Sequence, residues 1–159
     1  MIRSFRLTAA ALIATSFFAG CGNSPEALVV SAKEYAAKKD HKAAVIQLKN
    51  ALQKNPNLAE ARFLLGRSLL DSGDFVSAEK ELRRALELKH PVEEVAPPLA
   101  RALVAIGQHK KALDELSNTV VASPGGKAEL QTALGSAHIA LGNVPMARTA
   151  FEAALAANP

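Results

Sequence analysis

The sequence predicts an all-α protein, a row of four helical hairpins that follows an N-terminal export signal. Apolar residues recur at three- and four-residue spacing, which is the helical period. A pattern of small residues also repeats at intervals of 34, 34 and 35 residues. The composition agrees, because 49% hydrophobic residues in a chain of 159 suit one small helical domain rather than a disordered chain.

The clearest hairpin occupies residues 59–91. Gly66 belongs to its first helix, residues 71–74 (Asp-Ser-Gly-Asp) form the turn, and Leu82 lies in the middle of its second helix. A proline, Pro91, closes the hairpin, since proline does not continue a helix. The other hairpins follow the same register, and prolines 56, 124 and 159 stand at equivalent ends.

Small residues occupy three equivalent places in these hairpins. We expect them at helix contacts, because small side chains let the two helices of a hairpin approach closely. In the first helix of each hairpin the small residue is Ala32, Gly66, Ala100 or Gly135. In the second helix one position holds Ala44, Ala78, Ala112 and Ala147. A position seven residues later holds Ala51, Ala85 and Ala154. A period of 34 with small residues at fixed places is typical of tetratricopeptide repeats (TPRs). The chain therefore resembles a TPR solenoid, with repeats at 25–58, 59–92, 93–126 and 128–159.

The third repeat is irregular. Pro97 and Pro98 lie where its first helix is expected, and an interior proline costs about 3 kcal/mol. We therefore expect that helix to begin at Ala96 or Pro97, with a looser joint at residues 90–96 and another at 123–126.

Residues 1–20 have the layout of a signal peptide. Arg3 and Arg6 precede an apolar run of 12 residues, Leu7 to Phe18, which is too short to span a bilayer. The run ends Phe18-Ala19-Gly20-Cys21, which resembles the lipobox of bacterial lipoproteins and implies a covalent lipid on Cys21, with residues 21–24 as a short tether. Gly22 in place of aspartate resembles the outer-membrane sorting pattern and implies a periplasm-facing domain. The alternative is a secreted protein with a chance cysteine.

Charge and motifs argue against other classes of function. Beyond the signal peptide, 17 basic and 15 acidic side chains are too balanced for nucleic-acid binding. The four histidines show no metal-ligand spacing, and no nucleophile or phosphate-loop motif is complete. We therefore expect no enzyme, no cofactor apart from the lipid, no metal and no small-molecule substrate.

The TPR resemblance implies a concave groove, lined by the first helices, that binds a protein or peptide partner. In this groove, the ninth residue of each repeat would form a basic row and the second residue an acidic row. The two rows would lie side by side, because residues seven apart share a helix face. The basic row holds Lys33, Arg67, Arg101 and Ser136. The acidic row holds Glu26, Glu60, Glu94 and Glu129. Apolar contacts are offered by Phe63, Leu70, Val104 and Ile139. The alternative is that the two rows only neutralise each other and keep the face soluble.

Residues 21–120 resemble the start of the TPR-repeat lipoproteins of the PEP-CTERM system. The resemblance is carried by the stretch from Cys21 to Leu88, CGNSPEALVVSAKEYAAKKDHKAAVIQLKNALQKNPNLAEARFLLGRSLLDSGDFVSAEKELRRALEL. It implies a lipid-anchored envelope scaffold for exopolysaccharide export or exosortase-linked protein sorting. Two alternatives stay open: an assembly lipoprotein of another outer-membrane machine (pilus or barrel assembly), and an adaptor for a periplasmic peptidase.

The last helix of the chain carries few polar residues on the faces that a following repeat would cover. Open repeat arrays need a polar cap at their ends. We therefore expect these 159 residues to be the amino-terminal piece of a longer array, or a truncated product of one.

Overall fold

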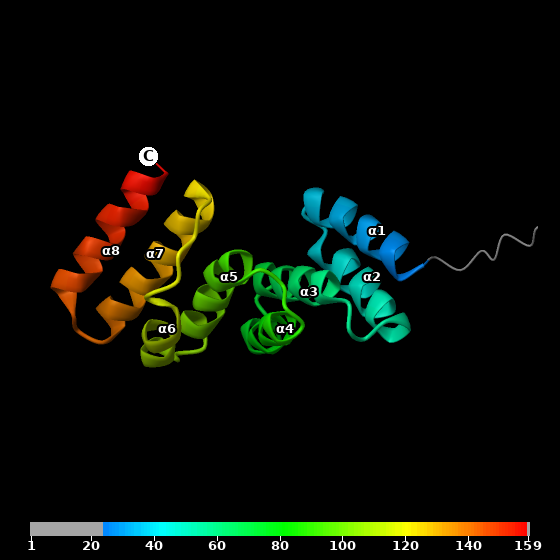
Figure 1. The fold of residues 1–159 in the computed structure, drawn as a ribbon, viewed down its shortest axis with the longest axis horizontal. Helices are drawn as coiled ribbons and strands as arrows, with labels where there is room; N and C mark the ends of the chain where they lie inside the picture. The colour runs from blue at the N-terminus through cyan, green and yellow to red at the C-terminus, as the bar shows by residue number, and fades with distance from the viewer. Residues whose placement is uncertain (1–23, 159) are drawn as a thin grey trace, which may run out of the picture.

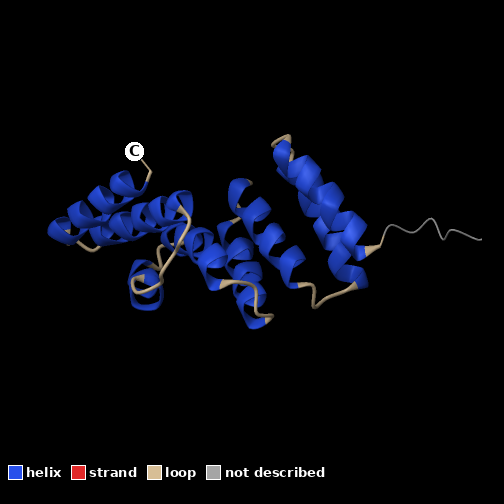
Figure 2. Cartoon of the chain, turned by 45° about the horizontal axis from the view of Figure 1, so that its top comes forward, coloured by secondary structure: helices blue, strands red, loops and turns tan. Residues whose placement is uncertain are grey.

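The computed structural model describes residues 24–158, which form eight α-helices joined by short loops (Figures 1 and 2). The predicted signal peptide and the predicted lipid site at Cys21 lie outside the described residues. The helices are α1 (Pro25–Ala37), α2 (His41–Lys54), α3 (Ala59–Asp71), α4 (Phe75–Glu87), α5 (Val92–Ala105), α6 (His109–Leu116), α7 (Pro124–Ala140) and α8 (Val144–Ala157). The all-α hairpin fold predicted from the sequence is confirmed.

The turn inside each hairpin has the same backbone geometry. One residue per turn has a positive φ angle, and these residues are Lys39 (61°), Gly73 (85°), Gly107 (77°) and Gly142 (75°). The next residue donates its N–H to a carbonyl five positions back, as Asp74 does to Leu69 at 2.9 Å. This is the Schellman ending of a helix, for which glycine is the favoured residue. Lys39 adopts the same conformation at a cost of roughly 1 kcal/mol.

The predicted packing places lie at the helix contacts. Ala44, Ala78 and Ala112 are fully buried, and Ala147 is 1% exposed. A Cβ atom added to Gly66 would lie 2.6 Å from Cγ of Leu82, so α3 and α4 approach more closely there than an alanine would allow. Gly135 meets the ring of Phe151 in the same way, which closes α7 onto α8. Small residues therefore set the spacing within the hairpins.

The stack of hairpins curves toward its first helices. α1 contacts α3, α3 contacts α5 and α5 contacts α7, whereas within residues 24–158 no two second helices bring their Cα atoms within 8 Å of each other. Each second helix instead packs on the first helix of the following hairpin, as α2 does on α3 and α4 on α5. Figure 1 shows the resulting arc, with α1 and α2 at one end and α7 and α8 at the other. The first helices thus form the concave layer.

The predicted start of α5 is wrong. The helix begins at Val92, so residues 92–96 are helical rather than a loose joint, and Pro97 and Pro98 lie inside it. The two prolines remove the hydrogen bonds that residues 97 and 98 would donate to Glu93 and Glu94. Burial outweighs that cost, because Val95, Leu99 and Leu103 are at most 1% exposed and each contributes about 1.5–3 kcal/mol.

The predicted joint at residues 123–126 is also wrong. Ser123 caps α7, and its hydroxyl accepts the N–H of Gly126 at 3.3 Å, so the helix already begins at Pro124. The irregular segment lies earlier, after the short helix α6, where Val121 is buried in the core. α7 consequently packs more extensively on α5, its neighbour in the concave layer, than on α6.

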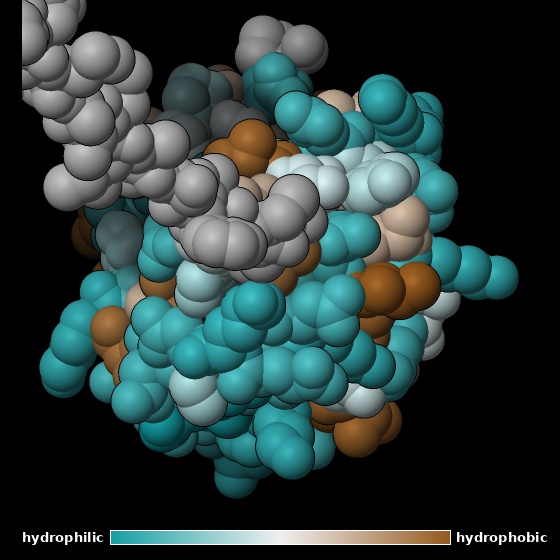
Figure 3. Space-filling model, turned by 90° about the vertical axis from the view of Figure 1, so that its right-hand side faces the viewer, coloured by the Kyte–Doolittle hydropathy of each residue, from teal (hydrophilic) through white to brown (hydrophobic). Residues whose placement is uncertain are grey.

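The two ends of the stack differ in surface polarity. In Figure 3, which faces the α1–α2 end, hydrophilic side chains cover most of the described surface that is visible. At the other end, α8 exposes Met146 (49%) and Leu155 (68%), with Arg148 and Glu152 as its only charged side chains. Among residues 24–158, no helix has the length and the apolar character required to cross a membrane. Continuation into a longer array stays a prediction.

The two glycine contacts give matched substitutions with different expected results. Gly66→Ala should lower the free energy of unfolding by about 1–2 kcal/mol, because the new Cβ meets a fully buried leucine and overpacking exceeds the helix-propensity gain of about 1 kcal/mol. Gly135→Ala should change it little, because the half-buried ring of Phe151 can turn away. Urea unfolding of both variants tests this, and equal losses would contradict it.

Candidate functional site in the concave groove

A cavity of about 430 Å³ opens on the concave layer between α5 and α7. Leu70, Val104 and Ala133 supply its apolar floor, and Phe75 and Ala105 complete that part of the wall. Arg101, Glu129, Thr132 and Ser136 line the rest. The hydroxyls of Thr132 and Ser136 donate to carbonyls one turn back on their own helix, at 2.8 and 2.9 Å. Their oxygens keep acceptor capacity, and the cavity offers an apolar site with a polar edge.

A second cavity, of about 490 Å³, adjoins the first and shares Glu129 with it. Phe63 and Arg67 of α3 form one wall, and Glu93, Glu94, Pro97 and Pro98 of α5 form another. Ala122, Ser123 and Gly126, at the start of α7, close the third side. The second, third and fourth hairpins line the two cavities, which we call the groove.

The basic and acidic places pair with each other between successive hairpins. Lys33 lies 2.5 Å from Glu60, and Arg101 lies 2.9 Å from Glu129 and 3.8 Å from Asp71. All these side chains are at least one third exposed, so each pair contributes at most about 1 kcal/mol. The repeat register therefore brings the two rows together, but two of the three basic side chains already have carboxylate partners.

Arg67 and Glu94 do not pair with each other. The guanidinium of Arg67 lies over the ring of Phe63, 5.8 Å from its centroid, and His90 stacks on that ring at 4.3 Å. Nε2 of His90 lies 3.0 Å from the carboxylate of Glu94. Phe63 is only 7% exposed, with His90 stacked on its ring, which leaves it little room to serve as a stacking platform.

The structure gathers most of the expected groove residues around the two cavities. Leu70, Val104 and Ser136 line the first and Phe63 lines the second, while Glu26 and Ile139 are exposed on α1 and α7. Sequence reasoning missed Glu93, Phe75 and Ala105. Pro97 and Pro98 could have pointed to the α5 wall of the second cavity, since an energetically unfavourable residue inside a helix often marks a functional part of the backbone.

Two family models described as tetratricopeptide repeat match the chain, one over residues 35–97 and the other over residues 98–159. The chain belongs to the tetratricopeptide-repeat family. The TPR prediction made from the 34-residue period is confirmed at this level. No curated protein matches the chain.

Two solved structures share this TPR fold. The crystal structure of MamA has a TM-score of 0.72 and 24% identity, and the match covers 85% of this chain and 78% of that one. The structure described as the MamA RS-1 ArsTM double mutant has a TM-score of 0.72 and 22% identity, covering 87% of this chain and 77% of that one. At these identities the likeness concerns the fold alone.

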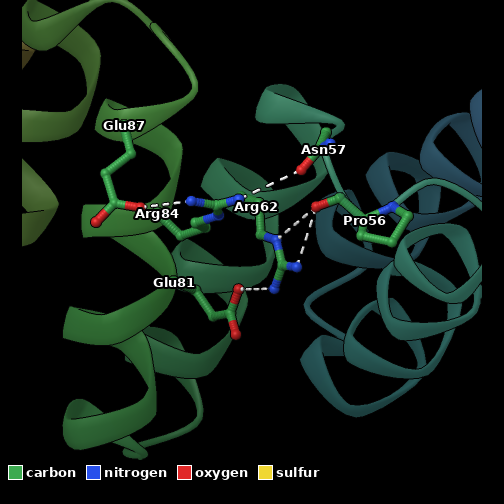
Figure 4. A network of polar contacts seen from close by, with 6 residues as sticks. All are labelled: Pro56, Asn57, Arg62, Glu81, Arg84 and Glu87. Atoms are coloured by element: carbon green, nitrogen blue, oxygen red, sulfur yellow. Dashed lines mark hydrogen bonds and ion pairs between the residues drawn. The ribbon is translucent and has the colours of Figure 1, made fainter.

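The TPR hairpins are joined on another face by a polar network (Figure 4). Arg62 donates to the carbonyl of Pro56 at 3.0 and 3.2 Å and to Glu81 at 2.7 Å, which ties the loop before α3 to α4. Arg84 bonds Glu87 and reaches Asn57 in the same loop. These arginines hold the loop between the first and second hairpins against the second hairpin.

A second arginine network links α4 to α6. Arg83 donates to Glu79 on its own helix and to Glu115 at 2.8 Å. Burial lowers the pKa of Arg83, but its hydrogen bonds to Glu79 and Glu115 outweigh that effect, so the pKa is raised and the guanidinium stays charged. Among the residues that the structure describes, no three His, Cys, Asp or Glu side chains are grouped as a metal site requires.

Proposed function

We propose that this chain is a lipid-anchored scaffold of the bacterial cell envelope, which holds a polypeptide partner in the concave groove. TPR domains generally mediate protein–protein interactions and are typically non-catalytic. The observation that carries the proposal is the pair of adjoining cavities, because they place apolar and polar groups side by side along three first helices. An extended chain of several residues matches such a groove better than a compact metabolite does.

A polypeptide also suits the groove better than a sugar. Phe63 and Phe75 are the aromatic residues that line the two cavities. Because Phe63 is only 7% exposed, Phe75 is the one exposed aromatic side chain among these lining residues, and sugar sites usually need more aromatic faces than that. A protein partner of a polysaccharide system is therefore a better candidate than the polysaccharide itself.

The envelope location and the pathway rest on sequence resemblance. The end of the apolar run at Cys21 supports a lipid anchor, and Gly22 supports sorting to the outer membrane with the TPR domain in the periplasm. The likeness of residues 21–120 to PEP-CTERM-system lipoproteins supports a role in exopolysaccharide export or exosortase-linked sorting. The domain would then recruit a protein component to the membrane surface.

Filling the first cavity should prevent partner binding. A photo-reactive amino acid at Thr132, exposed on the cavity wall, should cross-link a partner in living cells. Adding Ala105→Trp should reduce that adduct roughly thirtyfold, since blocking a central contact costs about 2 kcal/mol. Ala37→Trp, at the exposed end of α1, is the matched control.

Mass spectrometry of the adduct would identify the pathway. A PEP-CTERM or polysaccharide-export protein in the adduct supports the proposal. A pilus, barrel-assembly or peptidase component would instead assign the scaffold to that machinery. An adduct undiminished by Ala105→Trp, with helicity unchanged by circular dichroism, would contradict binding in the groove.

A further inference from the structure

The second cavity carries an excess of negative charge on a chain that is otherwise net positive. Glu93, Glu94 and Glu129 line it, and Arg67 is the only basic side chain among its lining residues. Arg101 pairs with Glu129 and Asp71, so Glu93 and Glu94 carry the excess of negative charge that remains in the cavity. The whole sequence has a formal net charge of +4, so the cavity differs from the rest of the chain in the sign of its charge.

The two glutamates stand on the turn of α5 that forms the wall of the cavity. Glu93, Glu94, Pro97 and Pro98 all line the second cavity. Pro97 and Pro98 have no N–H, so the carbonyls of Glu93 and Glu94 lack the donors that a regular helix supplies. The wall thus presents two carboxylates on one helical turn.

We propose that the second cavity binds a lysine or arginine side chain of the partner polypeptide, while the first cavity takes a neighbouring apolar side chain. The inference rests on the proposed function and specifies the partner's chemistry. Charge complementarity favours a cation, because a carboxylate at the same place would face Glu93 and Glu94 and gain only Arg67. The apolar floor of Leu70, Val104 and Ala133 selects the second side chain. The partner segment is therefore basic and amphipathic.

Peptide selection on the full chain, purified in mild detergent, tests the inference. A random-peptide library should yield binders that carry lysine or arginine next to an apolar residue. Combined Glu93→Gln and Glu94→Gln should weaken a selected peptide about tenfold, because both carboxylates that face the cation are removed. Glu34→Gln, on the exposed face of α1, should leave its affinity unchanged. Binding should also weaken as ionic strength rises.

Three outcomes would overturn the inference: selected peptides that are acidic or neutral, an affinity that the double variant leaves unchanged, or no selected peptide. The photo-cross-link at Thr132 separates this failure from failure of the scaffold proposal. An adduct that depends on the first cavity but not on Glu93 and Glu94 removes the cation site and leaves the scaffold standing. Absence of both the adduct and the peptides removes both proposals.

Discussion

Leu82→Ala is expected to lower the free energy of unfolding by about 3–5 kcal/mol. Leu82 lies in the middle of α4, is fully buried, and packs against Gly66 at the closest approach of α3 and α4. Removing its side chain leaves a cavity that neither helix can close, because Ala78 and Ala85 on either side are already small and fully buried. Denaturant unfolding followed by circular dichroism measures the loss.

Leu155→Ala is the matched control. Leu155 lies on α8 and is 68% exposed, so the same chemical change should cost less than about 0.5 kcal/mol. Repeat stacks are stabilised by contacts between neighbours, and a weakened second hairpin should also loosen the first and third. Hydrogen exchange would show that spread. Similar losses at positions 82 and 155 would contradict the close packing of α3 against α4.

Cys21→Ser is expected to release the protein from membranes into the soluble envelope fraction. Cys21 is the only cysteine and stands at the end of the apolar run, where a lipoprotein cysteine takes its acyl chains. Three chains hold a protein firmly, since each buried methylene contributes about 0.8 kcal/mol and one chain alone gives marginal binding. Membrane fractionation and incorporation of a labelled fatty acid measure the effect.

Asn23→Ser, two residues further along, is the control for that substitution, because it alters the tether and keeps the thiol. It should remain membrane-bound and labelled. Fatty-acid label incorporated equally in the Cys21→Ser variant would show that the lipobox interpretation is wrong and would favour a secreted protein.

Local sequence pattern alone determined the number and type of the helices and the places of closest contact. The 34-residue period placed Gly66 and Ala78 correctly, because a small residue at a helix crossing is required wherever two backbones approach, whatever surrounds them. Residues two turns apart on one helix share a face for the same geometric reason. These properties depend on one hairpin at a time, so the sequence is sufficient for them.

Tertiary structure decided the start of α5 and the chemistry of the groove. The sequence shows the cost of Pro97 and Pro98 but not the burial of Val95, Leu99 and Leu103 that outweighs it, because that burial depends on packing between hairpins. The same stacking set Arg101 against Glu129 and left Glu93 lining a cavity with Arg67. Contacts between repeats therefore decide that the second cavity is acidic, although the sequence places a row of basic residues along the same helices.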